Sequence, residues 1–525
     1  MKKSKFYITT PIYYPSGDAH IGHAYCTTIC DILARNKRLR GFETRFLTGT
    51  DEHGQKIKEH AKKAGKDTKV YIDEIVSKFQ KLWKLMEISN DDFIRTTEDR
   101  HTKVVQDFFS NMLKKEDIYL GEYKGWYCTE CEAFWTDIQV GMEHLCPDCH
   151  RPVHEASEES YFFKCNKYVN QLLEEYKKNP KLCFPTSRMN EMINTFIKPG
   201  LQDLSVSRTS NDWGITVKEN PKHTVYVWLD ALVNYISALG YPNGDLYKKF
   251  WQDENTEIIH VIGADISRFH CIYWPMFLMS TGLRLPDRIF VHGLLRIKDE
   301  KMSKSKGNVV SPYPLVERYG VDAVRYYLAR EVTFGRDGEF TPEQFVERIN
   351  VDLANQLGNL LNRTVSMIDK YFNGEIPEFK SNVTKFDTEI ENMIKASIKE
   401  YELNFDDLKI TEGVTSAMNL VARANKYIDE TAPWVLAKES KTEELKSVMS
   451  HLANVLYVSS ILLSPVLVHQ SKNILDQLGI PESLRNYQSI NKIGVIEKFK
   501  VKKGNQLFPR LDTKKEIDYI KGLMQ

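Results

Sequence analysis

The sequence lacks any long hydrophobic run and any excess of charge of one sign. The most apolar stretch, residues 452–468, contains one asparagine, three serines and one proline, so it is too polar for a membrane span and predicts a buried helix. Only three apolar residues separate the N-terminal lysines from Thr9, too few for a secretory signal. Lysine plus arginine (72) and aspartate plus glutamate (71) nearly cancel, so net charge neither favours nor excludes a nucleic acid partner. We therefore expect a soluble cytoplasmic protein with no membrane partner.

A disulfide framework is not expected either, because the chain has nine cysteines, an odd number. Four of them form two close pairs, Cys128-x2-Cys131 and Cys146-x2-Cys149, with 14 residues between the pairs. This spacing is typical of one structural Zn²⁺ whose four positions are all filled by thiolates, in a reducing compartment. The alternative is four unrelated reduced cysteines. The other five predict small core residues: Cys26, Cys30, Cys165, Cys183 and Cys271.

The first fifty residues predict one βαβ unit. Its parts are a strand at 6–9, a helix from about 18 to 40 and a strand at 44–48, and Asp18 is the expected N-cap of the helix. A chain of 525 residues exceeds a single hydrophobic core, so about three or four domains are expected.

A second series of strands begins near His223. Strands are predicted at 225–228, 258–262 and 289–291, with a helix at 266–280 between the last two. Because these strands are apolar on both faces, they indicate a parallel sheet that is covered on both sides. The sequence therefore predicts a doubly wound fold split by an insertion that carries the cysteine pairs.

After Pro312 the pattern becomes helical. Apolar residues at three- and four-residue spacing, typical of a helix bundle, occur at 345–371, 388–403, 408–430 and 445–463. The tail from about residue 472 is mixed and rich in lysine, and its cluster at 508–510 is expected to dock on the core.

Two short motifs carry the chemistry. The first, His20-Ile21-Gly22-His23, is predicted in the first turn of a helix, where unpaired N–H groups and the helix dipole favour phosphate. The second, Lys301-Met302-Ser303-Lys304-Ser305, places two lysines where they can neutralise the charge on departing pyrophosphate. Either motif alone is weak evidence for such a site. A pattern like the first usually lies at an exposed helix end, and a pattern like the second usually lies in a solvated loop. Together and in this order they indicate a site that activates a carboxylate with ATP.

The two motifs resemble the HIGH and KMSKS motifs of the class I aminoacyl-tRNA synthetases. From Tyr7 to Gln525 the sequence is similar to the methionyl-tRNA synthetase family along nearly its whole length. The resemblance implies a ligase that converts L-methionine and ATP-Mg²⁺ to methionyl-adenylate and pyrophosphate, and then charges the 3′-terminal adenosine of initiator and elongator tRNA(Met). A monomer is expected, because longer relatives append a dimerising tRNA-binding domain after a position like Gln525.

The implied fold class is α/β: a Rossmann-like parallel-sheet catalytic domain split by a zinc-bearing insertion and followed by an all-α helix-bundle anticodon-binding domain. The expected boundaries are 1–115 and 223–295 for the catalytic halves, 116–222 for the insertion with its zinc knuckle, 296–345 for the KMSKS-loop domain, 346–471 for the anticodon-binding domain and 472–525 for the docking tail.

The resemblance also assigns roles to residues. The catalytic group comprises His20, His23, Lys301 and Lys304. ATP-binding residues are Gly22, Gly263, Asp265, His292, Ser303 and Lys304. The methionine site comprises Pro11, Ile12, Tyr14, Asp51, Trp228, Ala231, Leu232, Tyr235, Ile266 and His270, with Tyr14 and His270 expected to contact the sulfur and Asp51 the ammonium group. The metal ligands are Cys128, Cys131, Cys146 and Cys149, and the anticodon readers are Asn359, Arg363 and Trp434.

Several of these residues have simpler interpretations. Asp51 or Asp265 could cap a helix, and the stripe from Trp228 to Tyr235 at helical spacing could be ordinary core. Trp434 beside a proline could be packing, and Arg363 could lie on a solvated face. Many relatives have lysine where this chain has Ala264, which leaves a basic contact from that loop in doubt.

Two other functions remain open at this level. The first alternative is another class I synthetase. The enzymes for valine, isoleucine and leucine carry a far larger editing insertion than this chain has, and the cysteine enzyme uses a zinc inside its catalytic pocket, whereas the thiols here lie in the insertion. A non-catalytic zinc-bearing tRNA-binding relative is the second, and it predicts decay of the histidine and lysine motifs, which are intact. Homocysteine is the expected competitor, since one methyl group in an apolar pocket is worth about 1–3 kcal/mol.

Overall fold

The computed structural model describes residues 3–129, 131, 133–135, 137–297, 300, 301, 310–332 and 335–524. The chain forms two compact units. One, here called the sheet unit, comprises Met1–Ala19, Glu43–Trp83 and Ser89–His292. The other, here called the helical unit, comprises His20–Phe42, Lys84–Ile88 and Gly293–Gln525. Among the described residues, no helix is both long and apolar enough to cross a membrane.

The sheet unit is built on a six-stranded sheet whose strand order is β3-β2-β1-β11-β12-β7. All five pairings are parallel. The strands are β1 (Lys5–Thr9), β2 (Glu43–Thr50), β3 (Asp92–Arg95), β7 (Cys183–Phe184), β11 (Thr256–Gly263) and β12 (Arg288–His292). The predicted parallel sheet is therefore confirmed, and its strands end at one common edge where the following loops begin.

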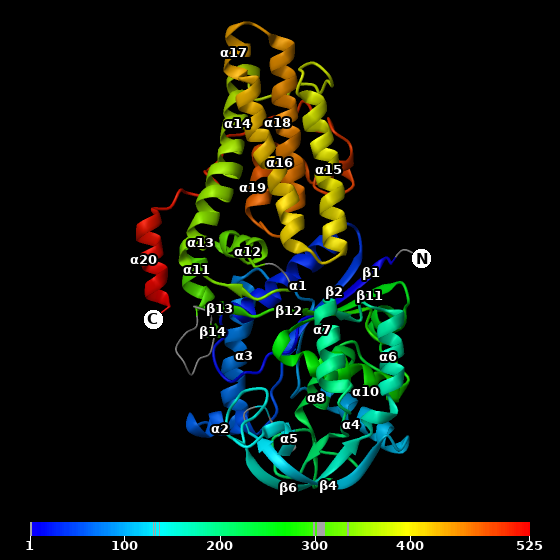
Figure 1. Ribbon diagram of the computed structural model, residues 1–525. Helices are drawn as coiled ribbons and strands as arrows, with labels where there is room; N and C mark the ends of the chain where they lie inside the picture. Colours follow the sequence, from blue (N-terminus) through cyan, green and yellow to red (C-terminus); the bar gives the residue numbers. More distant parts are fainter. Residues whose placement is uncertain are drawn as a thin grey trace. The chain divides into compact units, whose positions relative to one another are not determined.

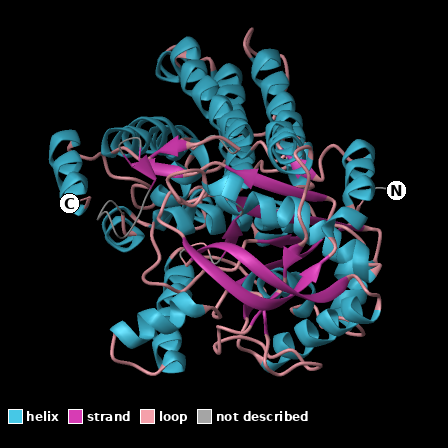
Figure 2. Cartoon of the chain, turned by 60° about the horizontal axis from the view of Figure 1, so that its bottom comes forward, coloured by secondary structure: helices cyan, strands magenta, loops and turns pink. Residues whose placement is uncertain are grey.

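Both faces of this sheet are buried, as the apolar runs predict. Every residue of β11 is buried, and Phe6, Tyr7 and Ile8 of β1 have no exposed surface. One core cluster joins sheet residues to the helices α4 (Asp99–Lys114), α8 (Val227–Ser237) and α10 (Trp274–Thr281). Figure 2 shows helices lying against the strands. A parallel sheet needs such cover because neither of its faces is polar.

The strand predicted at 225–228 is wrong. Only Thr224–Val225 is extended, as β10, and it pairs antiparallel with β9 (Ser207–Arg208) outside the central sheet. Tyr226 is the N-cap of α8, so Val227 and Trp228 begin a helix. The β-branched and aromatic residues favour a strand locally, but a helix that is apolar on nearly all sides is stabilised by burial in the core.

The insertion forms a four-stranded antiparallel sheet with the order β5-β4-β6-β8. Its strands are β4 (Ile118–Cys128), β5 (Ala133–Trp135), β6 (His154–Phe163) and β8 (Leu204–Ser205). The short helix α5 (Asp137–Val140) lies between the two cysteine pairs in the sequence. After α6 (Val169–Lys178) the chain returns to the central sheet as its edge strand β7, before α7 (Thr186–Glu191).

The helical unit begins with α1 (Ile21–Leu39), whose N-cap is His20. The Asp18 cap predicted from the sequence is therefore wrong. Aspartate is a favoured cap, but here the imidazole of His20 accepts the hydrogen bond from the backbone N–H of Gly22 and takes that place. The helix consequently begins three residues later than the sequence pattern suggests, directly on the first motif.

A buried arginine fastens α1 to the rest of this unit. Arg325 of α12 (Val321–Arg330) has no exposed surface and donates to Asp31 of α1 at 2.6 Å. It also donates to the carbonyls of Pro465 and Val466, at 2.8 and 3.1 Å. Because a buried charge needs a full set of partners, these bonds hold α1 and the segment after α18 in one arrangement.

The predicted helix bundle is confirmed. Its helices α14 (Asn359–Phe372), α15 (Asp387–Asp406), α16 (Ile410–Thr431) and α18 (Thr442–Leu463) run alongside one another (Figure 1). The short α17 (Pro433–Lys438) joins α16 to α18. A π-helical stretch, Ile349–Gly358, connects α13 (Pro342–Arg348) to α14. The apolar stretch at 452–468 belongs mostly to α18 and is buried, as expected.

The remaining elements flank these cores. In the C-terminal tail, Phe508 is buried and Glu516 of α20 (Thr513–Leu523) accepts hydrogen bonds from Arg318 and Tyr319 of α11 (Pro312–Tyr319). Bounds of the other elements are α2 (Gln55–Lys63), α3 (Thr68–Leu85), α9 (Asp245–Tyr247), α19 (Gln470–Gln477), β13 (Leu295–Ile297), β14 (Glu300–Lys301) and β15 (Gly338–Glu339).

Candidate active site and metal centre

The two motif histidines form a reciprocal cap at the start of α1. His20 Nδ1 accepts from the Gly22 N–H at 3.1 Å, and His23 Nδ1 accepts from the His20 N–H at 3.1 Å. Their ring centroids are 3.9 Å apart. Since Nδ1 is the acceptor in both rings, the proton of each neutral imidazole sits on Nε2. The first turn therefore carries two imidazole N–H donors beside the positive end of the helix dipole.

Gly22 is required by this cap. A Cβ at this position would lie 2.9 Å from Cε1 of His20, which is too close for any side chain to be accepted without moving the ring. The resemblance assigns Gly22 to the ATP-binding residues, where a glycine would let the phosphate or ribose approach the backbone. The structure adds a second reason, which is room for the capping imidazole.

The second motif is only partly placed. The backbone of Lys301 ends β14, which pairs antiparallel with β13. Ser303 and Lys304 lie outside the described residues, as does the side chain of Lys301. The roles assigned to these three residues therefore rest on the motif itself.

Asp51 follows β2 at the common edge of the central sheet. Its N–H donates to the carbonyl of Tyr13 at 2.9 Å, which holds the loop after β1 beside the loop after β2. The alternative role of Asp51 as a helix cap is wrong, since α2 begins at Gln55 with Gly54 as N-cap and no side-chain cap. Glu52 is engaged elsewhere, by Arg95 at 2.6 Å. Asp51 as a residue is 8% exposed, so a cation that reached its carboxylate would be largely shielded from water.

Gly263, Asp265 and His292 lie at the same edge. The short helical turn Ala264–Ile266 follows β11 with Gly263 as N-cap and no side-chain cap, so the capping role considered for Asp265 is also wrong. The carboxylate of Asp265 folds back over Gly263, where a Cβ would lie 2.7 Å from its Oδ1. His292 ends β12 and is 6% exposed. Three of the predicted nucleotide-binding residues therefore share one edge of the sheet unit.

The predicted methionine pocket centres on α8. Trp228, Ala231, Leu232 and Tyr235 occupy one stripe of this helix, as their spacing predicts. The Trp228 ring stacks on Phe269 with 3.9 Å between centroids and 4° between planes. The Tyr235 hydroxyl lies 2.7 Å from His270 Nε2. Ile12 and Ile266 pack against the same core cluster, Pro11 is half-buried, and Tyr14 packs against a smaller cluster with Ile57 and Ile72.

The hydrogen bonds of His270 change the role expected for it. Its Nδ1 donates to the Ile266 carbonyl at 3.0 Å, so Nε2 is an acceptor and the Tyr235 hydroxyl is the donor. Burial lowers the pKa of His270 to about 4, so the ring is neutral at pH 7. Both ring nitrogens are engaged within the protein. In this arrangement His270 orients Tyr235, and the hydroxyl oxygen of Tyr235 is the polar atom beside the apolar stripe.

A buried polar network that was not predicted from the sequence surrounds Asp230 of α8. Asp230, in α8, accepts from His53 Nδ1 and His101 Nε2, both at 2.7 Å, and it is fully buried. Burial would raise the pKa of Asp230, but attraction and hydrogen bonds from the two histidines lower it. Because His53 is two residues from Asp51, the network ties the Asp51 loop to the pocket helix. The available signal was a charged residue, Asp230, among the mostly apolar residues of α8, since a buried charge needs partners.

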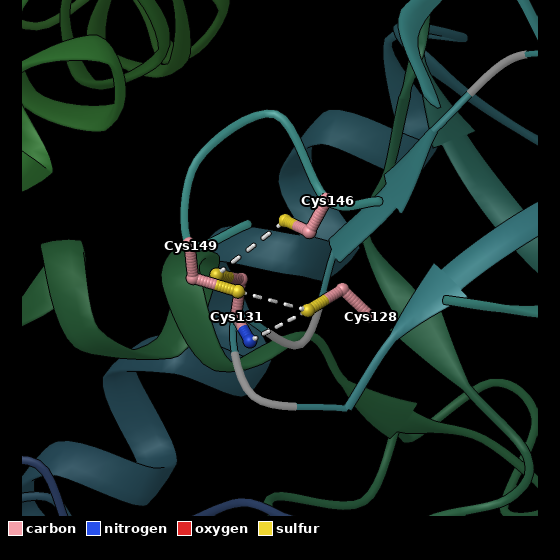
Figure 3. A group of neighbouring side chains, drawn as sticks. All are labelled: Cys128, Cys131, Cys146 and Cys149. Atoms are coloured by element: carbon pink, nitrogen blue, oxygen red, sulfur yellow. Dashed lines mark hydrogen bonds between the residues drawn. The ribbon is translucent and has the colours of Figure 1, made fainter. Parts of the chain in front are cut away.

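The four paired cysteines converge in the insertion. Their sulfur atoms all lie within 4.8 Å of one another, and Figure 3 shows them turned toward a common centre. The Cys128–Cys149 and Cys131–Cys146 sulfur distances are 3.5 and 3.8 Å. Zn–S bonds of about 2.3 Å in a tetrahedron require sulfur atoms about 3.8 Å apart, so the thiols fit this ion. The other five cysteines are buried and unpaired with one another by disulfides, as expected for core residues.

The anticodon candidates come together at one end of the bundle. Arg363 lies one turn after Asn359 in α14, and its guanidinium is 5.9 Å from the ring centroid of Trp434 in α17. Trp434 is 47% exposed although tryptophan is usually buried, so the simple packing interpretation does not account for it. Asn359 is exposed on α14.

Comparisons with known proteins show the family to which this sequence and this fold are similar. The family described as tRNA synthetases class I (M) matches residues 6–156 and 152–365, and the anticodon binding domain of methionyl tRNA ligase matches residues 376–519. Methionine–tRNA ligase from Bacillus subtilis is 54% identical over 100% of this chain and 80% of its own length, and that from Oceanobacillus iheyensis is 52% identical over 100% and 79%. The Mycobacterium tuberculosis methionyl-tRNA synthetase in complex with methionyl-adenylate is 38% identical, with a TM-score of 0.92 over 97% of this chain and 100% of that chain.

Proposed function

This chain belongs to the methionyl-tRNA synthetases of class I, and we propose that it joins L-methionine to initiator and elongator tRNA(Met) at the expense of ATP. In the first step the methionine carboxylate attacks the α-phosphorus of ATP, giving methionyl-adenylate and pyrophosphate. In the second a hydroxyl of the 3′-terminal adenosine takes the methionyl group, and AMP leaves. The observation that carries the proposal is the intact pair of imidazole donors on α1 in a chain related to methionine–tRNA ligases along its whole length.

Catalysis is proposed to rest on positioning and charge stabilisation, with no covalent enzyme intermediate. The Nε2–H groups of His20 and His23 donate to phosphate oxygens as charge develops on them. Lys301 and Lys304 stabilise the departing pyrophosphate, with Ser303 and the Gly22 backbone as further phosphate contacts. ATP would carry Mg²⁺ into the site, and the ion would neutralise part of the phosphate charge. Gly263, Asp265 and His292 are proposed to hold the adenosine moiety at the edge of the sheet.

The amino acid is proposed to lie between the Asp51 loop and α8. Asp51 would pair with the α-ammonium group in a site that excludes most water, where such a pair is strong. The thioether would lie against an apolar and aromatic surface with the Tyr235 hydroxyl as its polar neighbour, which suits a polarisable and weakly accepting sulfur. This surface comprises Pro11, Ile12, Tyr14, Trp228, Ala231, Leu232, Tyr235, Ile266 and His270.

Each range of the chain is proposed to have its own role. We assign the carboxylate chemistry to residues 1–115 and 223–295, the metal knuckle to 116–222, the pyrophosphate loop to 296–345 and anticodon recognition to 346–471, with 472–525 as a tail on the core. Asn359, Arg363 and Trp434 are proposed to read the anticodon, because exposed aromatic and guanidinium groups stack and bond unpaired bases. Thiolate ligands require a reducing compartment, so we place the protein in the cytoplasm.

The four-cysteine cluster is proposed to hold one structural Zn²⁺. Because all four positions are filled by protein, the ion would fix the fold of the insertion and take no part in the reaction. Elemental analysis of freshly purified protein is expected to give about one zinc per chain, and Cys131→Ala is expected to reduce that value strongly. Cys165→Ala, which removes a buried cysteine outside the cluster, is the matched control and should retain the metal. Freshly purified protein without zinc would contradict the assignment.

The amino-acid specificity separates this function from its alternatives. We expect ATP–pyrophosphate exchange with methionine, and exchange with homocysteine at kcat/KM reduced by about 10–200-fold, the effect of one methyl group in an apolar pocket. Leucine, isoleucine, valine and cysteine, tested in parallel, should be poorer substrates than methionine. A preference for one of these four would indicate a sister synthetase. If none of the amino acids tested supports ATP–pyrophosphate exchange, the protein is a non-catalytic relative.

A further inference from the structure

Arg268 connects the metal knuckle to the predicted methionine pocket. Its guanidinium carbon lies 4.8 Å from the ring centroid of Trp135, which belongs to the small core around the four cysteines. A guanidinium nitrogen lies 3.6 Å from the carboxylate of Asp148, between Cys146 and Cys149 in the sequence. On the knuckle side, one arginine therefore contacts both the packed tryptophan and the loop that supplies two of the four thiols.

The same guanidinium contacts the pocket side. It lies 5.0 Å from the ring centroid of Phe269 and 5.3 Å from that of Phe196. Phe269 in turn stacks on Trp228, at 3.9 Å and 4°. The contacts therefore form one continuous series, Trp135–Arg268–Phe269–Trp228, that begins at the cysteine cluster and ends at the side of the pocket.

Burial strengthens the contacts in this series. The side chain of Arg268 is 14% exposed, while Trp135 and Phe269 are 3% and 6% exposed. A guanidinium shielded from water gains more from aromatic faces and from a carboxylate than one on the surface does. Arg268 also lies two residues from Ile266 and from His270. The Ile266 carbonyl accepts from His270 Nδ1, and His270 Nε2 accepts from the Tyr235 hydroxyl, so this segment orients Tyr235 through His270.

We infer that Arg268 is a positioning residue for the amino-acid site, and that it transmits the fold of the cysteine cluster to Trp228 and Tyr235. The inference rests on the proposed methionine pocket. It gives the knuckle a specific task in the first reaction step, namely to fix one side of the pocket that selects the amino acid. A planar, delocalised cation is suited to this place, because it can stack on rings on two sides while it keeps an ion pair at its edge.

The test measures exchange kinetics for Arg268→Met, which keeps the side-chain length and removes the charge and planarity. KM for methionine is expected to rise about five- to thirtyfold, the loss associated with desolvated cation–π contacts, while KM for ATP and the zinc content stay unchanged. Arg268→Lys should recover part of the loss, since it restores the charge but not the planar stack. Arg188→Met, which breaks an ion pair with Glu191 within the same unit, is the control and should behave as wild type.

A double-mutant cycle then tests transmission from the knuckle. Asp148→Asn should raise KM for methionine in the wild-type background but add nothing in the Arg268→Met background, since both changes act through one contact. An unchanged KM for methionine in Arg268→Met would overturn the inference. Equal increases in both KM values, or loss of zinc, would also overturn it, because the arginine would then be a general structural residue.

A separate variant tests whether the methionine pocket is assigned correctly. Trp228→Ala removes the last ring of the series and is expected to raise KM for methionine whatever Arg268 does. If Trp228→Ala has no effect, the pocket assignment fails. If Trp228→Ala raises KM but Arg268→Met does not, the pocket stands and only the role of Arg268 is lost.

Discussion

Replacing His23 by alanine is expected to lower kcat for methionine-dependent exchange by about 10²–10³-fold, the usual effect of removing one preorganised donor from a developing charge. The reason is geometric. His23 Nδ1 accepts from the His20 N–H, so its Nε2 carries the proton and is the donor that we propose for the phosphate. KM for methionine should change little, because His23 is not among the residues proposed to bind the amino acid. Steady-state exchange with varied methionine and ATP measures both quantities.

The control must account for the lost helix cap. His23→Ala also removes a hydrogen bond at the start of a helix, which costs about 1 kcal/mol of stability. Asp512→Ala removes a comparable cap, the bond from the Lys515 N–H to the Asp512 carboxylate at the start of α20. We expect Asp512→Ala to keep wild-type exchange activity while losing similar thermal stability. Wild-type kcat in His23→Ala would contradict the proposed role of the imidazole.

The second large effect is expected at the end of the helix bundle that carries Trp434. Trp434→Ala should raise KM for tRNA(Met) in aminoacylation by about 5–150-fold, the value of about 1–3 kcal/mol for one base stacked on an aromatic ring. Methionine-dependent exchange, which does not use tRNA, should be unchanged. Arg363 approaches the same ring and is held by Asp429 at 3.0 Å, so the aromatic surface is kept in place before tRNA arrives.

Leu403→Ala provides a matched control, since Leu403 is a large apolar residue on the same bundle and is 60% exposed. It precedes the turn between α15 and α16, whereas Trp434 follows the other end of α16, a helix of 22 residues that is about 33 Å long. Leu403→Ala should leave KM for tRNA unchanged. If Trp434→Ala instead abolishes exchange, Trp434 is a structural residue and its role in anticodon recognition is wrong.

The sequence was informative where burial and periodicity agree. β1 and β11 are apolar on both faces, and they are neighbouring parallel strands in the centre of the sheet. The four cysteines converge because two close pairs in one small insertion leave few other arrangements. Pro433 begins α17, in keeping with the preference of proline for the first helical position, and Trp434 follows it in the first turn.

The errors occurred where tertiary contacts outweigh local preference. Tyr226, Val227 and Trp228 have strand-forming side chains, yet the helix they begin is stabilised by packing on the sheet. Asp18 is a better intrinsic cap than histidine, but the paired imidazoles of the motif provide the cap themselves. A local sequence pattern contains no information about the sheet against which α8 packs or about the imidazole pair that caps α1.

Hydrogen-bond direction was also beyond the sequence. His270 was expected to contact the sulfur, but its carbonyl partner Ile266 fixes the proton on Nδ1 and makes Nε2 an acceptor for Tyr235. The network joins Asp230 to His53, 177 positions away, and to His101, 129 positions away, so no spacing rule could reveal it. Such details depend on which side chains the fold brings together.

A crystal structure of this chain with a non-hydrolysable methionyl-adenylate analogue would locate each group of the proposed site. We predict that the analogue's ammonium group pairs with Asp51, its thioether lies against Ala231 and the Tyr235 hydroxyl, and its phosphate accepts hydrogen bonds from Nε2 of His20 and His23. A ligand whose side chain lies away from α8, or whose phosphate has no imidazole contact, would contradict this prediction.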